Sequence, residues 1–311
     1  MYGTAARLLP GARAAADIAE SLRLLLQASA AGHTGADALL AVMSGMGVGM
    51  AQDWDQALDH LQRAAERGSV AARGQLRALA GQDASADTDL PGGEAWPRLR
   101  RSINLGSWLL RPEKTVLSKT PRAVSVRNFL STAVCDWLIA RARGRTQRAL
   151  VHDAATEAGR EGSGRNNTYF EFGFLELDLV VVLVRARIAA TIGVPVPVLE
   201  TPQVLHYEVG ERYARHHDYF DPRQPGHAAQ IASGGQRIVT FLVYLNAAYE
   251  GGETDFPLIG LRHRGAPGDA LYFGNVEAGG APDPRTLHAG LAPSQGEKWL
   301  LSQWVRDRSP G

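Results

Sequence analysis

The chain has 311 residues, enough for one large or two ordinary domains, and its 45% apolar content is sufficient to fill their cores. Its formal net charge of +1 leaves no excess of positive charge to draw the protein onto nucleic acid or an anionic membrane, so we expect neither as a partner.

The lone cysteine and the lack of a hydrophobic leader bear on the compartment. Cys135 by itself excludes an intrachain disulfide and a cysteine-rich zinc site. The N-terminal residues contain no apolar core of signal-peptide length, and no run of about 18 apolar residues occurs. We therefore expect a soluble protein of the reducing cytoplasm.

The first third of the chain carries an internal repeat. "AAGHTGADALL" at 30–40 matches "AERGSVAARGQL" at 65–76, with Gly32 aligned on Gly68 at an offset of 36 residues. This offset is typical of helix-turn-helix solenoids, and apolar residues recur at helical spacing. The pattern predicts an all-helical domain over 1–82, followed by a Gly/Pro/Asp-rich linker over 83–98.

The stretch "ALLAVMSGMGVGMAQDWDQALDHLQRAAERG" resembles a Sel-one-like repeat, a relative of the tetratricopeptide repeat. The resemblance implies a groove that presents itself to protein partners. Two units are few, however, and the alternative is that they only brace the neighbouring domain.

From residue 99 to 311 the sequence mixes two helices with many short strands. "AVSVRNFLSTAVCDWLIARA" predicts a strand and then a helix capped at Ser131 or Thr132, and "ELDLVVVLVRARIAATIG" predicts a helix closed by Gly193. We expect both helices to flank a sheet. Closely spaced apolar runs separated by turn residues favour a sandwich or barrel over a parallel α/β sheet. The predicted strands are "PQVLHYEV", "RYARHHDYF", "QRIVTFLVYLN", "DALYFGN", "RTLHAGL" and "KWLLSQWVRD".

The segment "RYARHHDYF" holds a candidate metal site. Residues i and i+2 of a strand point the same way, so His216 and Asp218 can reach one ion while His217 faces the other side. His288 can supply the third ligand of a two-histidine, one-carboxylate site, which leaves coordination positions open for substrates. A histidine on a strand is more often structural, so these residues alone are a modest signal.

Lys298 strengthens the case for a site. A lysine on an inward-facing strand position is costly to bury unless an anion meets it, as a dicarboxylate cosubstrate would. We expect "PSQG" to fold the strands of His288 and Lys298 into a hairpin, and alternation to place Trp304 on the pocket face. The alternative is a lysine that reaches the surface from a hairpin end.

Residues 120–306 resemble the prolyl 4-hydroxylase branch of the iron(II) and 2-oxoglutarate-dependent dioxygenases. The resemblance rests on four blocks in order: "QVLHYEVGERYARHHD", "RIVTFLVYLNAAYEGGETDFP", "GDALYF" and "TLHAGLAPSQGEKWLLSQW". It implies a double-stranded β-helix (jelly roll) with flanking helices, with iron on His216, Asp218 and His288. It also implies that Lys298 meets the distal carboxylate of 2-oxoglutarate. The further cosubstrate-pocket residues that it implies are Tyr207, Thr240, Tyr244 and Trp304.

The resemblance further implies hydroxylation of a peptidyl residue, most simply proline, coupled to conversion of 2-oxoglutarate and dioxygen to succinate and carbon dioxide, with ascorbate as reductant. Because related halogenases lack the carboxylate, Asp218 favours hydroxylation. The family's Arg-Thr-Ser motif corresponds here to Arg165 followed by two asparagines, which leaves the substrate open. We name Arg165, Asn167 and Tyr219 as candidate substrate contacts, in a cleft covered by the loops at 159–173 and 221–236.

Two other functions are compatible with the sequence. One is hydroxylation of a free amino acid or small molecule, with the repeats as a mere extension. The other is a binding or scaffold protein that retains the fold without turnover, which the complete ligand set argues against.

Overall fold

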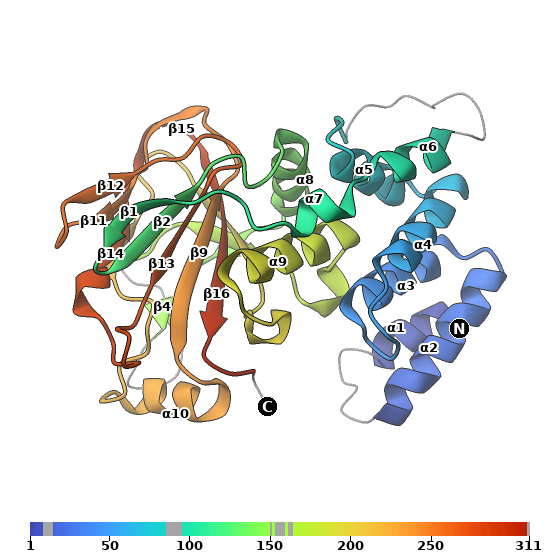
Figure 1. Cartoon of the computed structure of the whole chain (residues 1–311), viewed down its shortest axis with the longest axis horizontal. Helices are drawn as coiled ribbons and strands as arrows, with labels where there is room; N and C mark the ends of the chain where they lie inside the picture. The colour runs from blue at the N-terminus through green and yellow to red at the C-terminus, as the bar shows by residue number, and fades with distance from the viewer. Residues whose placement is uncertain (9–14, 85–94, 150, 153–158, 161–163, 310–311) are drawn as a thin grey trace. The chain divides into compact units, whose positions relative to one another are not determined.

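The computed structural model describes residues 1–8, 15–84, 95–149, 151–152, 159–160 and 164–309 (Figure 1). They form two compact units: Met1–Leu110 with Phe172–Thr191, and Arg111–Glu171 with Ile192–Gly311. The predicted division was 1–82, 83–98 and 99–311. Helix α6 (Ala95–Ser102) crosses the predicted boundary at 98, and most of the predicted linker, 85–94, lies outside the described residues.

The first unit is helical, as the apolar spacing predicts. Its core joins Leu25 of one helix to Leu40 and Met43 of the next, with Phe174 packed against them. Among the described residues, none of the helices combines the length and apolar character needed to cross a bilayer. The helices are α1 (Tyr2–Leu8), α2 (Ala15–Ala30), α3 (Thr34–Met46), α4 (Trp54–Glu66), α5 (Val70–Leu79), α6, α7 (Leu105–Leu109) and α9 (Leu179–Ile192).

The turns before α3 and α5 have the same geometry. Gly32 and Gly68 both take the left-handed conformation, with φ of 88° and 93°. After each glycine the next backbone N–H bonds to a carbonyl five residues back, and His33 or Ser69 then caps the following helix. The two turns, 36 residues apart, are therefore equivalent in local structure as well as in sequence.

The second unit contains two larger antiparallel sheets. One has eight strands in the order β1-β2-β13-β9-β16-β7-β6-β3, and the other has four in the order β12-β11-β14-β8. Smaller pairs are β10-β15 and β4-β5. The strands are β1 (Thr115–Lys119), β2 (Arg122–Val126), β3 (Gln147–Arg148), β4 (Val151–His152), β5 (Gly159–Arg160), β6 (Thr168–Glu171), β7 (Gln203–Tyr207), β8 (Tyr213–His216), β9 (Arg237–Tyr244), β10 (Tyr249–Gly251), β11 (Thr254–Phe256), β12 (Leu261–His263), β13 (Ala270–Gly274), β14 (His288–Gly290), β15 (Pro293–Gly296) and β16 (Lys298–Arg306).

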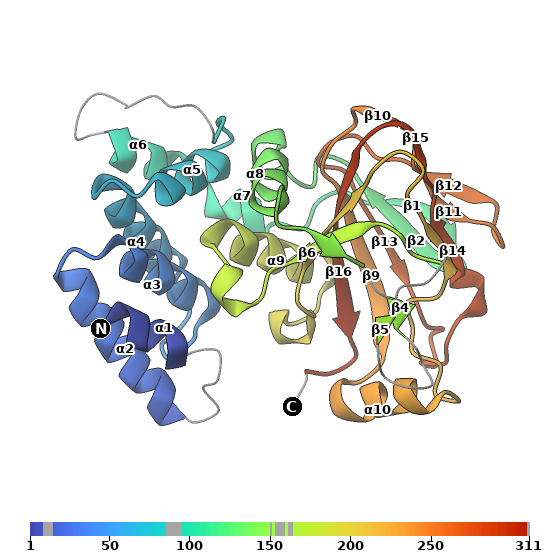
Figure 2. The same ribbon diagram turned by 180° about the vertical axis from the view of Figure 1, so that it is seen from behind.

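The chain alternates between the two sheets. It passes from β7 to β8, back to β9, and later from β13 to β14 and back to β16 (Figures 1 and 2). Side chains of both sheets meet in one core, in which Tyr244 of β9 and Phe273 of β13 pack with Phe256 of β11. This arrangement is consistent with the predicted double-stranded β-helix, and Leu242 and Tyr244 of β9 lie in the core between the sheets.

The two predicted helices of this region fold as helices, but they fall in different units. Helix α8 (Thr132–Ala142) lies in the second unit, where it contacts β7, and Ser131 caps it through the backbone N–H of Val134. Helix α9 groups instead with the first unit, where its first N–H donates to Gln75. The expectation that these helices flank the sheet is confirmed for α8, which contacts β7.

Two local predictions were wrong. "PSQG" is not a hairpin turn: it is β15, which pairs with β10, and the strands of His288 and Lys298 lie in different sheets. The segment 221–236 is not only a loop, because α10 (Pro225–Gly234) occupies most of it, with proline at its first turn. Part of the other expected lid, 161–163, lies outside the described residues.

Candidate active site

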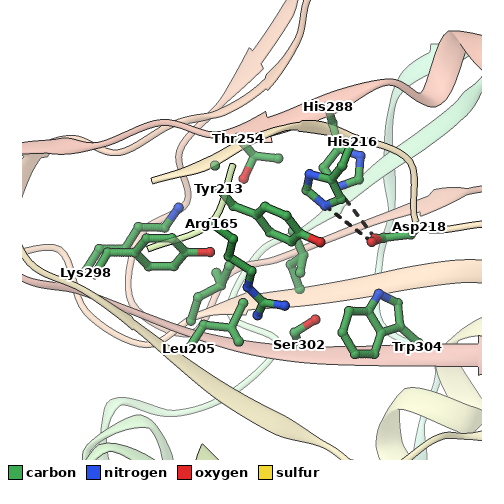
Figure 3. Close-up of a pocket in the computed structure, with 14 residues that line it drawn as sticks. Arg165, Leu205, Tyr213, His216, Asp218, Thr254, His288, Lys298, Ser302 and Trp304 are labelled. Carbon is green, nitrogen blue, oxygen red and sulfur yellow. Dashed lines mark ion pairs between the residues drawn. The ribbon is translucent and has the colours of Figure 1, made fainter. Parts of the chain in front are cut away.

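A pocket of the second unit lies between its eight-stranded and four-stranded sheets (Figure 3). Its polar side chains come from β7, β8, β11, β14 and β16, from the segment after β8 and, for Arg165, from the segment before β6. Its apolar wall comes from β7, β9 and β16. The residues that line it are Arg165, Leu205, Tyr207, Tyr213, His216, Asp218, Leu242, Thr254, His288, Gly290, Lys298, Leu300, Ser302 and Trp304.

The three predicted metal residues meet in this pocket. His288 lies directly across from His216 in the pairing of β14 with β8, and Asp218 follows β8 by two residues. The Nε2 atoms of His216 and His288 lie 3.4 and 3.6 Å from the carboxylate oxygens of Asp218. One potential ligand atom of each residue lies within 4.8 Å of those of the other two. The cluster has the two-histidine, one-carboxylate composition typical of open iron sites.

Backbone carbonyls orient both imidazole rings. The Nδ1 atom of His216 lies 2.8 Å from the carbonyl oxygen of Ala214, and that of His288 lies 3.0 Å from the carbonyl of Thr286. A carbonyl only accepts, so each Nδ1 carries the proton and each Nε2 keeps its lone pair. Both lone pairs are therefore available on the side of Asp218.

The charge states of the cluster suit a cation. Burial lowers the pKa of His288 to about 4, and the neighbouring His216 adds to the effect. Burial acts to raise the pKa of Asp218, but His288, His216 and the Thr240 hydroxyl outweigh it and hold that pKa well below its usual range. At neutral pH His288 is thus neutral and Asp218 ionised, the forms that bind a metal.

His217 does not join the cluster. Its Nε2 atom lies 3.0 Å from the carbonyl of Pro284, and its ring packs against that of Tyr219 with 4.6 Å between centroids. Tyr219, a predicted substrate contact, is half-buried and does not line the pocket. Strand alternation thus separated His216 from His217 as expected.

Lys298 is fully buried at one end of the pocket. Its Nζ donates to the carbonyl of Gly252 at 2.7 Å and lies 5.0 Å from the ring centroid of Tyr207. No ion pair joins it to a carboxylate of the described residues, and burial lowers the pKa of Lys298 to about 7, which the charge of Glu253 offsets only in part. A buried ammonium in this state favours an anionic ligand.

The other predicted cosubstrate residues divide into two pairs. Tyr207 and Trp304 line the pocket. Thr240 and Tyr244 do not: the Thr240 hydroxyl donates to Asp218 at 2.6 Å, and the Tyr244 hydroxyl is 2.9 Å from that of Thr254. Their polar groups bind other pocket residues and so support the pocket from behind.

Arg165 reaches the pocket and Asn167 supports it. The Nε of Arg165 donates to the side-chain oxygen of Asn167 at 3.0 Å, while its Nη2 is buried without a hydrogen-bond partner. Asn167 is fully buried and does not line the pocket. The indole Nε1 of Trp304 is likewise a buried donor without a partner. Two unpaired donors suit an oxygen-rich ligand.

Two features of the site escaped the sequence analysis. Tyr213 stacks on His216 with 3.4 Å between ring centroids. Strict alternation along a strand would place these two residues, three apart, on opposite faces. The pairing of β14 with β8 contains a register shift at this point, which breaks the alternation. Arg237 lies 3.8 Å from the ring centroid of Trp304 and binds Glu200 through two hydrogen bonds of 2.7 Å. Both partners of Arg237 are distant in sequence, so no local pattern indicates its position.

Sequence comparison identifies the family. Residues 202–306 match the 2OG-Fe(II) oxygenase superfamily. Prolyl 4-hydroxylase 1 of Arabidopsis thaliana is 32% identical over 248 aligned residues, which cover 75% of this chain and 84% of that protein. The chain belongs to the prolyl 4-hydroxylase family of 2OG-Fe(II) oxygenases. Probable prolyl 4-hydroxylase 6 of the same plant is 34% identical over 215 residues, covering 63% of this chain and 73% of that protein.

A solved structure gives a further comparison. The viral collagen prolyl hydroxylase of Paramecium bursaria chlorella virus-1, in its 2-oxoglutarate complex, is 27% identical, covers 59% of this chain and 94% of its own, and has a TM-score of 0.46.

The pocket fits the cofactor and cosubstrate of this oxygenase family, Fe(II) and 2-oxoglutarate. Two imidazoles oriented through Nδ1, with Nε2 directed at one ionised carboxylate, suit Fe(II) and leave positions for 2-oxoglutarate and dioxygen. Lys298, which pairs with no carboxylate of the described residues, suits the distal carboxylate of 2-oxoglutarate. Apolar residues such as Leu205 and Leu300 line the wall between these charged groups.

Replacing Lys298 should separate binding from stability. In Lys298→Met we expect 2-oxoglutarate affinity to fall about 10- to 100-fold, because a hydrogen bond to a charged group is lost. We expect the free energy of unfolding of the apoprotein to stay level or rise, because a buried unmatched charge is gone. Calorimetry and urea denaturation measure the two, with the exposed Lys119→Met as control. Unchanged affinity in Lys298→Met would contradict the assignment.

The pH dependence of cosubstrate binding should follow Lys298. Below its pKa of about 7 the side chain is already an ammonium, whereas above it the free protein must take up a proton to bind the anion. With Fe(II) already bound, we expect 2-oxoglutarate affinity to fall as pH rises above 7, by at most about tenfold per pH unit. Calorimetry at pH 8 in buffers of different protonation enthalpy should reveal proton uptake approaching one per site. No uptake at pH 8 would rule out a neutral Lys298 in the free protein.

Proposed function

We propose that this oxygenase hydroxylates a prolyl residue within a peptide or protein, using His216, Asp218 and His288 to hold Fe(II) and Lys298 to hold 2-oxoglutarate. The observation that carries the proposal is the convergence of these four side chains on one pocket. The similarity to prolyl 4-hydroxylases over most of the chain supports the choice of proline.

The bound Fe(II) and 2-oxoglutarate supply the activation of dioxygen that oxidises a substrate C–H bond, with release of succinate and carbon dioxide. The protein's part is orientation. Lys298 holds the cosubstrate's distal carboxylate by a charge-assisted hydrogen bond, and the unpaired donors of Arg165 and Trp304 are placed to meet oxygen atoms of cosubstrate or substrate. Leu205 and Leu300 keep water from the space between these groups.

We also propose that the helices between residues 15 and 79 include Sel-one-like repeats that recruit a protein substrate. The equivalent turns at Gly32 and Gly68 support the repeat. Because 172–191 packs in the same compact unit, deleting the first 80 residues would strip helix α9 of its partners, and point substitutions in the full chain are the sounder test.

The histidine pair tests the metal site. We expect His216→Ala to abolish Fe(II) binding and hydroxylation, because a ligand is lost, and His217→Ala to retain Fe(II) binding, because its imidazole binds a backbone carbonyl instead. Anaerobic calorimetry measures the metal. Mass spectrometry of a proline-rich peptide, after reaction with Fe(II), 2-oxoglutarate and ascorbate, measures the gain of one oxygen atom.

The matched peptide with alanine in place of proline is the control. Oxidation of free proline but no peptide would favour the small-molecule alternative. Fe(II) binding without succinate formation from any substrate would favour the scaffold alternative. Equal loss of metal in both histidine variants would mean that the ligand set is wrong.

The repeat proposal has its own test. Val70 and Leu26 are exposed apolar side chains on α5 and α2, with 80% and 49% of their surface accessible. We expect Val70→Asp and Leu26→Asp to lower the rate on a full-length protein substrate and to leave the rate on a short peptide unchanged. Equal rates on the protein substrate in wild type and both variants would contradict recruitment through these faces.

A further inference from the structure

A chain of buried hydrogen bonds leads from Asn275, the residue that follows β13, to the carboxylate of Asp218. The Nδ2 of Asn275 lies 3.0 Å from the hydroxyl oxygen of Thr240, and that hydroxyl lies 2.6 Å from Oδ2 of Asp218. Asn275 is fully buried and Thr240 is 1% exposed. Neither side chain lines the pocket, so both act from behind the carboxylate.

The direction of each hydrogen bond follows from the groups themselves. An ionised Asp218 can only accept, so the single hydroxyl proton of Thr240 must point to it. The Thr240 oxygen then has only lone pairs left for Asn275, which must donate through its amide nitrogen. Turning the Asn275 amide over would set two acceptors against each other. The chain therefore runs one way, from amide to hydroxyl to carboxylate.

The backbone around Asn275 fixes the origin of this chain. Its N–H donates to the carbonyl of Ile238 in β9, and its carbonyl accepts from the N–H of Asp283. Thr240 itself pairs with Phe273 on one side and Trp304 on the other, in the middle of the eight-stranded sheet. Neither residue can move without disturbing the sheet, so the donor to Asp218 is held in place.

We propose that Thr240 and Asn275 are positioning residues for the metal carboxylate, a role that rests on the proposed function of His216, Asp218 and His288. Thr240 occupies Oδ2 of Asp218 and stops the carboxylate from turning. Oδ1, the other carboxylate oxygen, faces Nε2 of His216 at 3.4 Å. The hydroxyl thereby selects which oxygen is offered to the metal.

A purely structural role explains the arrangement less well. The side-chain oxygen of Asn275 is buried without a hydrogen-bond partner, which costs free energy that an apolar side chain in this core would avoid. Asn275 therefore lowers the stability of the fold relative to an apolar residue, but it supplies a hydrogen-bond donor to Thr240. That is the pattern expected where a buried polar residue serves a site rather than the fold.

Thr240→Val is the primary test, because valine keeps the shape and removes the hydroxyl. We expect Fe(II) affinity, measured by anaerobic calorimetry with Fe(II) alone, to fall about 10- to 100-fold. Thr240→Ser keeps the donor and should bind Fe(II) within about twofold of wild type. Asn275→Leu leaves Thr240 its proton but frees the hydroxyl to turn, so its loss of affinity should be smaller than that of Thr240→Val.

Thr191→Val is the matched control. Thr191 is an equally buried threonine of α9, in the other compact unit, and its hydroxyl donates to the carbonyl of Arg187. Its replacement should cost stability through a lost buried hydrogen bond, which urea denaturation measures, and leave Fe(II) affinity unchanged.

The possible results distinguish failure of the positioning role from failure of the proposed Fe(II) site. If the wild type binds Fe(II), Asp218→Ala does not, and Thr240→Val binds like Thr240→Ser, the metal site stands and the positioning role is overturned. If Thr240→Val and Thr191→Val lose affinity equally, the effect is general destabilisation and the role is also overturned. A wild type that binds no Fe(II) overturns both the role and the proposed metal site.

Discussion

The second unit is organised around two buried ionisable side chains, Asp218 and Lys298, that share one pocket. Asp218 is held as a carboxylate by His216, His288 and the Thr240 hydroxyl. Lys298 donates to the carbonyl of Gly252 and has no ion pair with a carboxylate among the residues that the structure describes. Burying such groups is costly, and the surrounding sheets must supply the free energy that holds them. A cation bound at Asp218 and a dicarboxylate bound at Lys298 would offset this cost. Ligand binding should therefore stabilise the fold.

The two-sheet architecture sets the distance between those charges. His216 and His288 are cross-strand neighbours in the four-stranded sheet, while Lys298 lies across from Tyr207 in the eight-stranded sheet. Because the chain alternates between the sheets, side chains from both project into the space between them. The eight-stranded sheet also carries Thr240 in its centre, so one rigid element supports the carboxylate end and supplies the lysine end of the pocket.

Much of this site was predictable from local patterns, and the failures have a common cause. The period of two along a strand separated His216 from His217, and coordination chemistry joined His216 and Asp218 to His288. The hairpin expected at "PSQG" was wrong because this segment pairs with β10, which is distant in sequence. Thr240 was assigned to the cosubstrate, yet its hydroxyl binds Asp218. Asn275 gave no signal, because its role depends on a contact with Thr240, 35 residues away.

The most direct measurement is the visible absorption of the Fe(II)-loaded protein when 2-oxoglutarate is added without dioxygen. A keto acid chelated to ferrous iron gives a charge-transfer band, so the account predicts that the band appears with one equivalent of 2-oxoglutarate and disappears on chelation of the metal. Lys298→Met should require a higher 2-oxoglutarate concentration for the same band. Tight 2-oxoglutarate binding that produces no band and is indifferent to removal of iron would contradict a single site built from His216, Asp218, His288 and Lys298.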